Sequence, residues 1–158
     1  MTTANTPSNS SSSPIEQYLR RLHAKYAALQ EGRVADYIPE LSKANPDWFG
    51  LCIATRDGQV YEVGDCRQPF TIQSISKALT FGLALEDRGE DYMLSRVSVE
   101  PSGEAFNAIS LKPGTGAPFN PMINAGAIAT CGQVLKQEGL SRFDRILACL
   151  SRYAGRPL

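Results

Sequence analysis

A single predicted β-hairpin, followed by a long series of helices and loops, most strongly limits what this chain can fold into. The β-rich segment 48–55 (WFGLCIAT) is followed by the turn sequence Arg56-Asp57-Gly58 and by a returning strand over 59–63. A two-stranded sheet is at best marginally stable in water, and it leaves an open edge and an uncovered apolar face. The sequence therefore predicts a hairpin that depends on helices, and on further strands, to become stable.

The sequence before the hairpin divides into an uncharged tail and a first helix. Residues 1–13 are mainly Ser, Thr, Asn and Pro, and they carry no charged side chain. Such a segment buries too little apolar surface to offset the entropy lost on ordering, so we expect a disordered tail. Ser13, Pro14 and Glu16 match the N-cap, N1 and N3 positions of a capping box, which predicts a helix from 14 to about 30.

Three helices are predicted after the hairpin. An apolar helix begins within 74–77 and continues to about Asp87, with Gly89 just beyond its end. Segment 91–121 is rich in Pro and Gly and only weakly periodic, which predicts a long loop with short turns. Segment 120–137 has small residues in series, typical of a helix packed closely against a neighbour. Ser141 and Asp144 resemble a second capping box, for a last helix that ends near Tyr153.

Composition excludes several classes of function. The chain has 16 basic and 16 acidic side chains, scattered along its 158 residues, so it lacks the positive patch that binds nucleic acid or an anionic membrane. No segment approaches the roughly 18 apolar residues of a membrane span, and the start lacks the pattern of a signal peptide, so we expect a cytoplasmic protein. The four cysteines lack metal-site spacing and are interpreted as reduced thiols. We expect no metal and no cofactor.

The single histidine narrows the chemistry further. His23 lies among the charged residues of the first predicted helix, and we interpret it as a surface or packing residue. Triads and metal centres that need histidine are therefore disfavoured.

Ser74 and Lys77 form the candidate catalytic pair. Three positions apart at the start of a helix, their side chains share one face. A desolvated lysine can act as the base for a serine hydroxyl, and a helix N-terminus offers N–H groups to a developing oxyanion. The S-x-x-K spacing is a known signature of acylating enzymes but is weak alone. In the alternative interpretation Ser74 only caps the helix and Lys77 points to solvent. Neither an S-D-N nor a K-T-G sequence follows, which disfavours a β-lactamase or transpeptidase.

Four segments resemble the serine-dependent glutaminases and occur in that family's order. They are VADYIPEL (34–41), FTIQSISK (70–77), EPSG with FN (100–107) and NPMINAGAI (120–128). The resemblance covers about residues 15–158. It implies an α+β, serine β-lactamase-like fold, in which an antiparallel sheet is packed by helices and joined by a helical subdomain. It also implies hydrolysis of L-glutamine to L-glutamate and ammonia, by an amidohydrolase without a cofactor.

The same resemblance assigns roles to individual residues. Ser74 is implied to be the nucleophile and Lys77 its base, through a γ-glutamyl ester on Ser74. Asn124 matches a substrate-binding asparagine, Tyr37 matches a tyrosine that lines the pocket, and the adjacent Gln73 is a further substrate-binding candidate. Two plainer interpretations stay open, in which Asn124 is a helix N-cap and Tyr37 a half-buried packing residue.

The end of the sequence departs from the family. The chain ends at Leu158, inside the expected helical region, so we interpret 14–158 as the N-terminal portion of a glutaminase domain and an incomplete copy of its fold. The resemblance implies a homo-oligomer, often a tetramer, and a short chain with little or no activity alone. Two alternatives remain: another Ser/Lys acyl enzyme of the penicillin-binding type, or a non-catalytic fragment that assembles with a partner chain through its open sheet edge.

Overall fold

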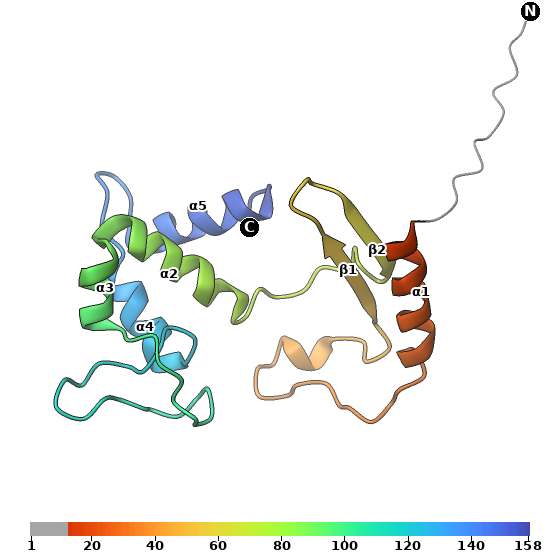
Figure 1. The fold of residues 1–158 in the computed structure, drawn as a ribbon, viewed down its shortest axis with the longest axis horizontal. Helices are drawn as coiled ribbons and strands as arrows, with labels where there is room; N and C mark the ends of the chain where they lie inside the picture. Colours follow the sequence, from red (N-terminus) through yellow and green to blue (C-terminus); the bar gives the residue numbers. More distant parts are fainter. Residues whose placement is uncertain (1–12) are drawn as a thin grey trace, which may run out of the picture. The chain divides into compact units, whose positions relative to one another are not determined.

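The computed structural model describes residues 13–158, so the expectation for the tail lies almost entirely outside the described residues. The chain divides after Phe70 into two compact units, and each is described by itself (Figure 1). The first unit contains helix α1 (Pro14–Tyr26), the short 3₁₀ helix η1 (Leu41–Lys43) and strands β1 (Gly50–Ala54) and β2 (Val60–Gly64). The second unit contains four helices.

The predicted hairpin is confirmed. Strands β1 and β2 pair antiparallel, with Cys52 opposite Glu62, and they form the two-stranded sheet of the described residues. The turn closes where the Gly58 amide donates to the Thr55 carbonyl at 3.0 Å. Gly58 has a φ of +86°, which explains why glycine suits this position.

Helix α1 packs against the hairpin through His23. The imidazole Nε2 lies 3.1 Å from the Phe49 carbonyl oxygen, and the imidazole stacks on the Phe49 ring with the centroids 4.8 Å apart. A Cβ at Gly64 would overlap the Phe49 carbonyl oxygen as well as His23 Nε2, and Gly64 has a φ of +78°, so this position favours glycine. His23 is thus a packing residue, as the sequence indicated.

The end of α1 was predicted wrongly. The helix stops at Tyr26, four residues before the expected Gln30. Beyond this point Leu29 is 60% exposed, so continuing the helix would bury no apolar side chain to offset the ordering entropy. At the other end the Ser13 hydroxyl accepts a hydrogen bond from the Ile15 amide at 3.3 Å, as expected for the N-cap. The capping box predicted with Glu16 is wrong, because Ser13 bonds the amide of Ile15 and the Glu16 carboxylate accepts from Arg20 instead.

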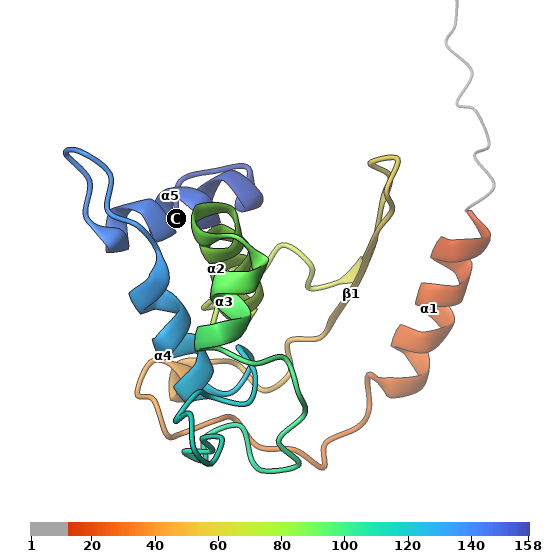
Figure 2. The same cartoon turned by 60° about the vertical axis from the view of Figure 1, so that its left-hand side comes forward.

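The second unit consists of α2 (Ile75–Arg88), α3 (Glu90–Arg96), α4 (Asn124–Gln133) and α5 (Arg142–Ala154). Helix α2 packs against the other three (Figure 2). The core cluster is formed by Leu83, Ala84, Met93, Val134 and Cys149.

Gly89, with a φ of +80°, ends α2 as predicted. At α5 the predicted capping box between Ser141 and Asp144 is present. The Ser141 hydroxyl and the Ser141 backbone N–H both donate to the Asp144 carboxylate, and these two hydrogen bonds lower the pKa of Asp144.

Helix α3 corrects the sequence-based expectation of a loop from residue 91. Its seven residues span two turns, too short for a helical period to be recognised. Met93 is fully buried and belongs to the core, so tertiary packing stabilises this short helix. From Val97 to Ile123 the chain is irregular, as expected, apart from an isolated bridge between Leu111 and Pro118.

An ion pair joins α2 to the start of α5. The two terminal guanidinium nitrogens of Arg145 donate to the Asp87 carboxylate, at 2.7 and 2.8 Å, and the side chains of Arg145 and Asp87 are 17% and 10% exposed. The same carboxylate accepts from the Leu135 amide at 2.8 Å. Chiefly because of the hydrogen bond from Arg145, the pKa of Asp87 is lowered. The pair fixes the 134–141 connection against the helical core.

Candidate active site

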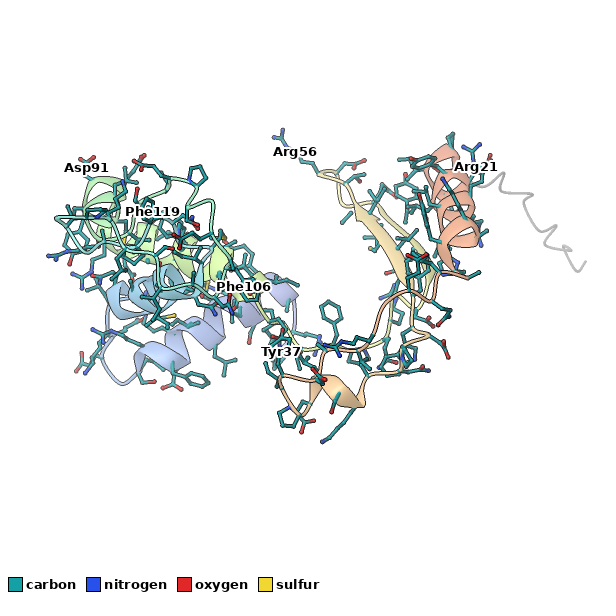
Figure 3. All side chains as sticks on the ribbon, turned by 90° about the horizontal axis from the view of Figure 1, so that it is seen from below. Arg21, Tyr37, Arg56, Asp91, Phe106 and Phe119 are labelled. Carbon is teal, nitrogen blue, oxygen red and sulfur yellow. The ribbon has the colours of Figure 1, made fainter. Side chains whose placement is uncertain are left out.

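The Lys77 ammonium is held by two acceptors of the second unit. Lys77 lies in the first turn of α2, and its Nζ donates to the Met122 carbonyl at 2.9 Å and to Asn124 Oδ1 at 2.7 Å. The Phe106 ring lies beside it, with Nζ 5.8 Å from the ring centroid, and Phe106 is drawn in Figure 3. The alternative in which Lys77 points to solvent is therefore wrong.

Ser74 precedes α2, and its hydroxyl is uncommitted. It occupies the N-cap position, yet its side chain accepts no capping hydrogen bond, and the residue is exposed. The interpretation of Ser74 as a helix cap is therefore wrong as well. The Lys77 amide donates to the Ser74 carbonyl at 3.2 Å, which places the two residues three positions apart on the same turn. No hydrogen bond joins the Ser74 hydroxyl to the Lys77 ammonium in the described part of the chain.

Asn124 is the first residue of α4 and not its N-cap, which is Ile123. The Asn124 amide N–H donates to the Phe106 carbonyl at 2.9 Å, while its side-chain oxygen accepts from Lys77. With Oδ1 fixed in this way, the Nδ2 group retains two donors for another partner. The alternative in which Asn124 caps the helix is wrong.

Asn120, not Asn124, satisfies the start of α4. Its Oδ1 accepts from the Met122 amide at 3.0 Å and from the Ile123 amide at 3.2 Å. A Cβ at Gly126 would lie 1.9 Å from the Asn120 carbonyl oxygen, so α4 passes this loop at a distance that only glycine permits. Gly126 thus permits a close approach, but to the preceding loop, and a Cβ at Gly132 would meet no atom within 4 Å. Helix α4 is also shorter than the predicted segment 120–137. Sequence reasoning missed the contributions of Asn120 and Met122, although an Asn-Pro pair is a usual turn signal.

Gln73 has an unusual backbone beside Ser74. Its φ is +45°, which makes it the one non-glycine residue with positive φ in the described chain. Its side-chain Nε2 donates to Thr71 Oγ1 at 3.0 Å, so the side chain folds back along its own segment. Left-handed backbone at a non-glycine residue costs about 1 to 2 kcal/mol and is frequent at functional sites.

The structure brings four of the five predicted site residues into the second unit. Ser74, Lys77, Gln73 and Asn124 lie around the start of α2 and α4, whereas Tyr37 belongs to the first unit. Tyr37 is 71% exposed, between α1 and η1 (Figure 3), so it is not the half-buried packing residue of the plainer interpretation. The role of Tyr37 in lining the substrate pocket stays a prediction.

Further questions for residues 13–158 concern metal-ligand clusters, cysteines and membrane-spanning helices. Over this range there is no group of three or more His, Cys, Asp or Glu side chains that could hold a metal ion. All four cysteines are free thiols. None of the helices formed within this range is long and apolar enough to cross a membrane.

Comparison with known proteins identifies the family. The family described as Glutaminase matches residues 32–158, which include every candidate site residue. The chain belongs to the glutaminase family. The chain is 57% identical over 143 residues to the glutaminase of Microcystis aeruginosa and 56% identical to that of a Nostoc species. These matches cover 90% of this chain, and the chain spans 42% and 43% of the lengths of the two glutaminases.

Solved structures agree with the fold. The crystal structure of Mglu in its glutamate form is 42% identical, with a TM-score of 0.83 over 94% of this chain and 34% of that one. A structure of a probable glutaminase from Bacillus subtilis, complexed with 6-diazo-5-oxo-L-norleucine, is 33% identical, with a TM-score of 0.63 over 90% of this chain and 40% of that one. The predicted α+β, serine β-lactamase-like fold of the glutaminases is confirmed for the part that the chain covers.

Proposed function

We propose that the whole protein hydrolyses the side-chain amide of L-glutamine to L-glutamate and ammonia. The observation that carries the proposal is the placement of Lys77. Its ammonium is held by Met122 and Asn124, within one helical turn of the uncommitted Ser74 hydroxyl. Membership of the glutaminase family supports the choice of substrate.

In the proposed reaction the Ser74 hydroxyl oxygen attacks the amide carbon of glutamine while Lys77 acts as the base that takes the hydroxyl proton. The positive end of the α2 helix dipole stabilises the negative charge that develops on the amide oxygen. Lys77 then passes the proton to the amide nitrogen, the carbon–nitrogen bond breaks, and ammonia leaves. Water attacks the γ-glutamyl ester, Lys77 again relays a proton, and glutamate and free Ser74 result.

We assign substrate binding to Asn124, Gln73 and Tyr37. Glutamine carries an ammonium, a carboxylate and an amide, and a site that pairs each group rejects analogues that lack one. The Nδ2 group of Asn124 offers donors that suit a carboxylate or carbonyl oxygen, since its Oδ1 is already occupied by Lys77.

The remaining expectations extend this proposal. We propose that residues 14–158 form the N-terminal portion of a glutaminase catalytic domain, that the whole protein assembles as a homotetramer, and that it works in the cytoplasm. Many large apolar side chains are exposed, among them Phe70 at 80%, Ile109 at 84% and Ile128 at 74%. Such exposure supports their burial by the rest of the whole protein or by other subunits.

Ammonia release from L-glutamine tests the proposal. The assay compares this chain, an extended protein in which it is continued by the remaining part of the Microcystis aeruginosa glutaminase, and a Ser74→Ala variant of that extended protein. We expect turnover by the extended protein, none by its Ser74→Ala variant, and little or none by the short chain. A matched control is Ser95→Ala, remote in sequence from the site, which should keep full activity.

The outcome separates the alternatives. A silent extended protein that is soluble and folded would contradict the proposed function. Labelling of Ser74 by a β-lactam without ammonia release would instead support an acyl enzyme of the penicillin-binding type. Robust turnover by the short chain would contradict only the expectation that it is inactive alone.

A further inference from the structure

We propose that Ser76 is a positioning residue that holds the strained turn presenting Ser74. The inference rests on the proposed function, because it concerns how the nucleophile of that reaction is kept in place. Ser76 lies in the first turn of α2, between Ser74 and Lys77.

The turn before Ser74 is unusual for its residue type. Gln73 has a φ of +45°, a left-handed conformation in which Cβ crowds the backbone of any residue except glycine. Asn and Asp tolerate this region better, yet the position carries Gln. A strained conformation persists only where the surrounding structure over-determines it.

Ser76 supplies the hydrogen bonds that hold this conformation. Its hydroxyl donates to the Gln73 carbonyl at 2.7 Å, and its backbone N–H donates to the same oxygen at 3.3 Å. The Gln73 side chain is anchored separately, through its hydrogen bond to Thr71. The Gln73 carbonyl is therefore held by Ser76 from the C-terminal side, and Ser74 lies between the two residues.

This arrangement fixes the nucleophile through the backbone. The Ser74 side chain makes no capping hydrogen bond of its own, so its position depends on the backbone at 73 and 74. Catalysis by a serine is sensitive to small displacements of the attacking oxygen. Loss of the Ser76 hydroxyl would let the turn relax and would move the Ser74 oxygen away from the line of attack.

The test uses the extended protein and measures kcat and KM for L-glutamine. Ser76→Ala should lower kcat about tenfold with KM changed less than about twofold, the equivalent of losing one hydrogen bond in the transition state. Ser76→Thr keeps a hydroxyl and should restore kcat to within about threefold of the parent. The matched control is Ser95→Ala, because the Ser95 hydroxyl makes the same type of bond, to the Tyr92 carbonyl at 2.6 Å, in the same unit.

A second variant tests the route through Gln73. Asn adopts the left-handed region more readily than Gln, so in a Gln73→Asn background the turn needs less support. The loss of kcat caused by Ser76→Ala should then shrink from about tenfold to about threefold or less. A purely structural role in starting the helix would give the same loss in both backgrounds.

The results separate this inference from the proposed function. If the extended protein is active and Ser76→Ala behaves like Ser95→Ala, the inference is wrong and the proposed function stands. If Ser76→Ala lowers kcat equally in both backgrounds, Ser76 does not act through Gln73 and the inference is overturned. If the parent protein itself releases no ammonia, the proposed function fails first, and the inference falls with it.

Discussion

The ammonium nitrogen of Lys77 lies 2.7 Å from the side-chain oxygen of Asn124, a residue 47 positions further along the chain. This contact joins the start of α2 to the start of α4, and the Phe106 carbonyl, which accepts from the Asn124 amide, adds the intervening loop to the same cluster. Three separate segments thus determine where one lysine amine lies.

Replacing Asn124 with Ala should remove both an acceptor for Lys77 and the proposed donors to substrate. We expect kcat/KM for L-glutamine to fall about hundredfold in the extended protein, because a charged hydrogen bond and a substrate contact are lost together. Asn45→Ala is the matched control, since the Asn45 side chain only accepts from the Asp47 amide in a turn of the first unit. A loss smaller than about threefold would contradict the role of Asn124.

Replacing Lys77 with Arg distinguishes a catalytic lysine from a merely structural one. Arginine keeps the positive charge and the donors for Met122 and Asn124, but it does not lose its proton and cannot act as a base. Ammonia release should fall about thousandfold, while the thermal unfolding midpoint changes little. Lys112→Arg, at the ion pair with Glu100, should leave activity unchanged. Retention of more than a tenth of the activity by Lys77→Arg would show that Lys77 is not the base.

The Asp87–Arg145 pair predicts a specific dependence of stability on pH. The pKa of Asp87 is lowered in the folded state, so its contribution is complete above its unfolded pKa of about 3.9 and is lost as pH falls through the lower folded value. Asp87→Asn should lower the free energy of unfolding by about 2 kcal/mol at pH 7, because Arg145 is left without its counter-charge. The difference from the parent should shrink below about pH 4.

Urea unfolding followed by circular dichroism at pH 7 and pH 3 measures this effect. Asp47→Asn, on an exposed turn, serves as the control and should change stability by less than about 0.5 kcal/mol at either pH. A penalty for Asp87→Asn that grows on acidification would contradict the sign of the prediction.

Thr130 offers a stabilising substitution. Thr130 is 1% exposed, and its hydroxyl has no hydrogen-bond partner. Valine has nearly the same shape without the unsatisfied group, so Thr130→Val should raise the free energy of unfolding by about 1 kcal/mol. Thr55→Val removes a hydroxyl that donates to the Gln59 carbonyl, and it should not stabilise. Differential scanning calorimetry of both variants checks the contrast, and destabilisation by Thr130→Val would refute it.

Local signals in the sequence predicted much of the fold. The hairpin, the Ser141–Asp144 capping box and the end of α2 at Gly89 depend on residues close together in the chain, so short motifs were sufficient. Helix α3 and the early end of α1 were missed because packing decides both. Helix α3 is stabilised because Met93 packs in the core with Val134 and Cys149. Helix α1 ends early because no other residue buries Leu29, which stays exposed.

The candidate site divides in the same way. The sequence by itself determined the Ser74–Lys77 spacing and, through resemblance, the roles proposed for Asn124, Gln73 and Tyr37. Only the tertiary structure decided that Lys77 contacts Asn124 and Met122, that Ser74 leaves its helix uncapped, and that Gln73 adopts a left-handed turn held by Ser76. The physical reason is range: turns and caps are set by neighbours within four residues, whereas the Lys77 ammonium is placed by acceptors that folding brings from 45 and 47 residues away.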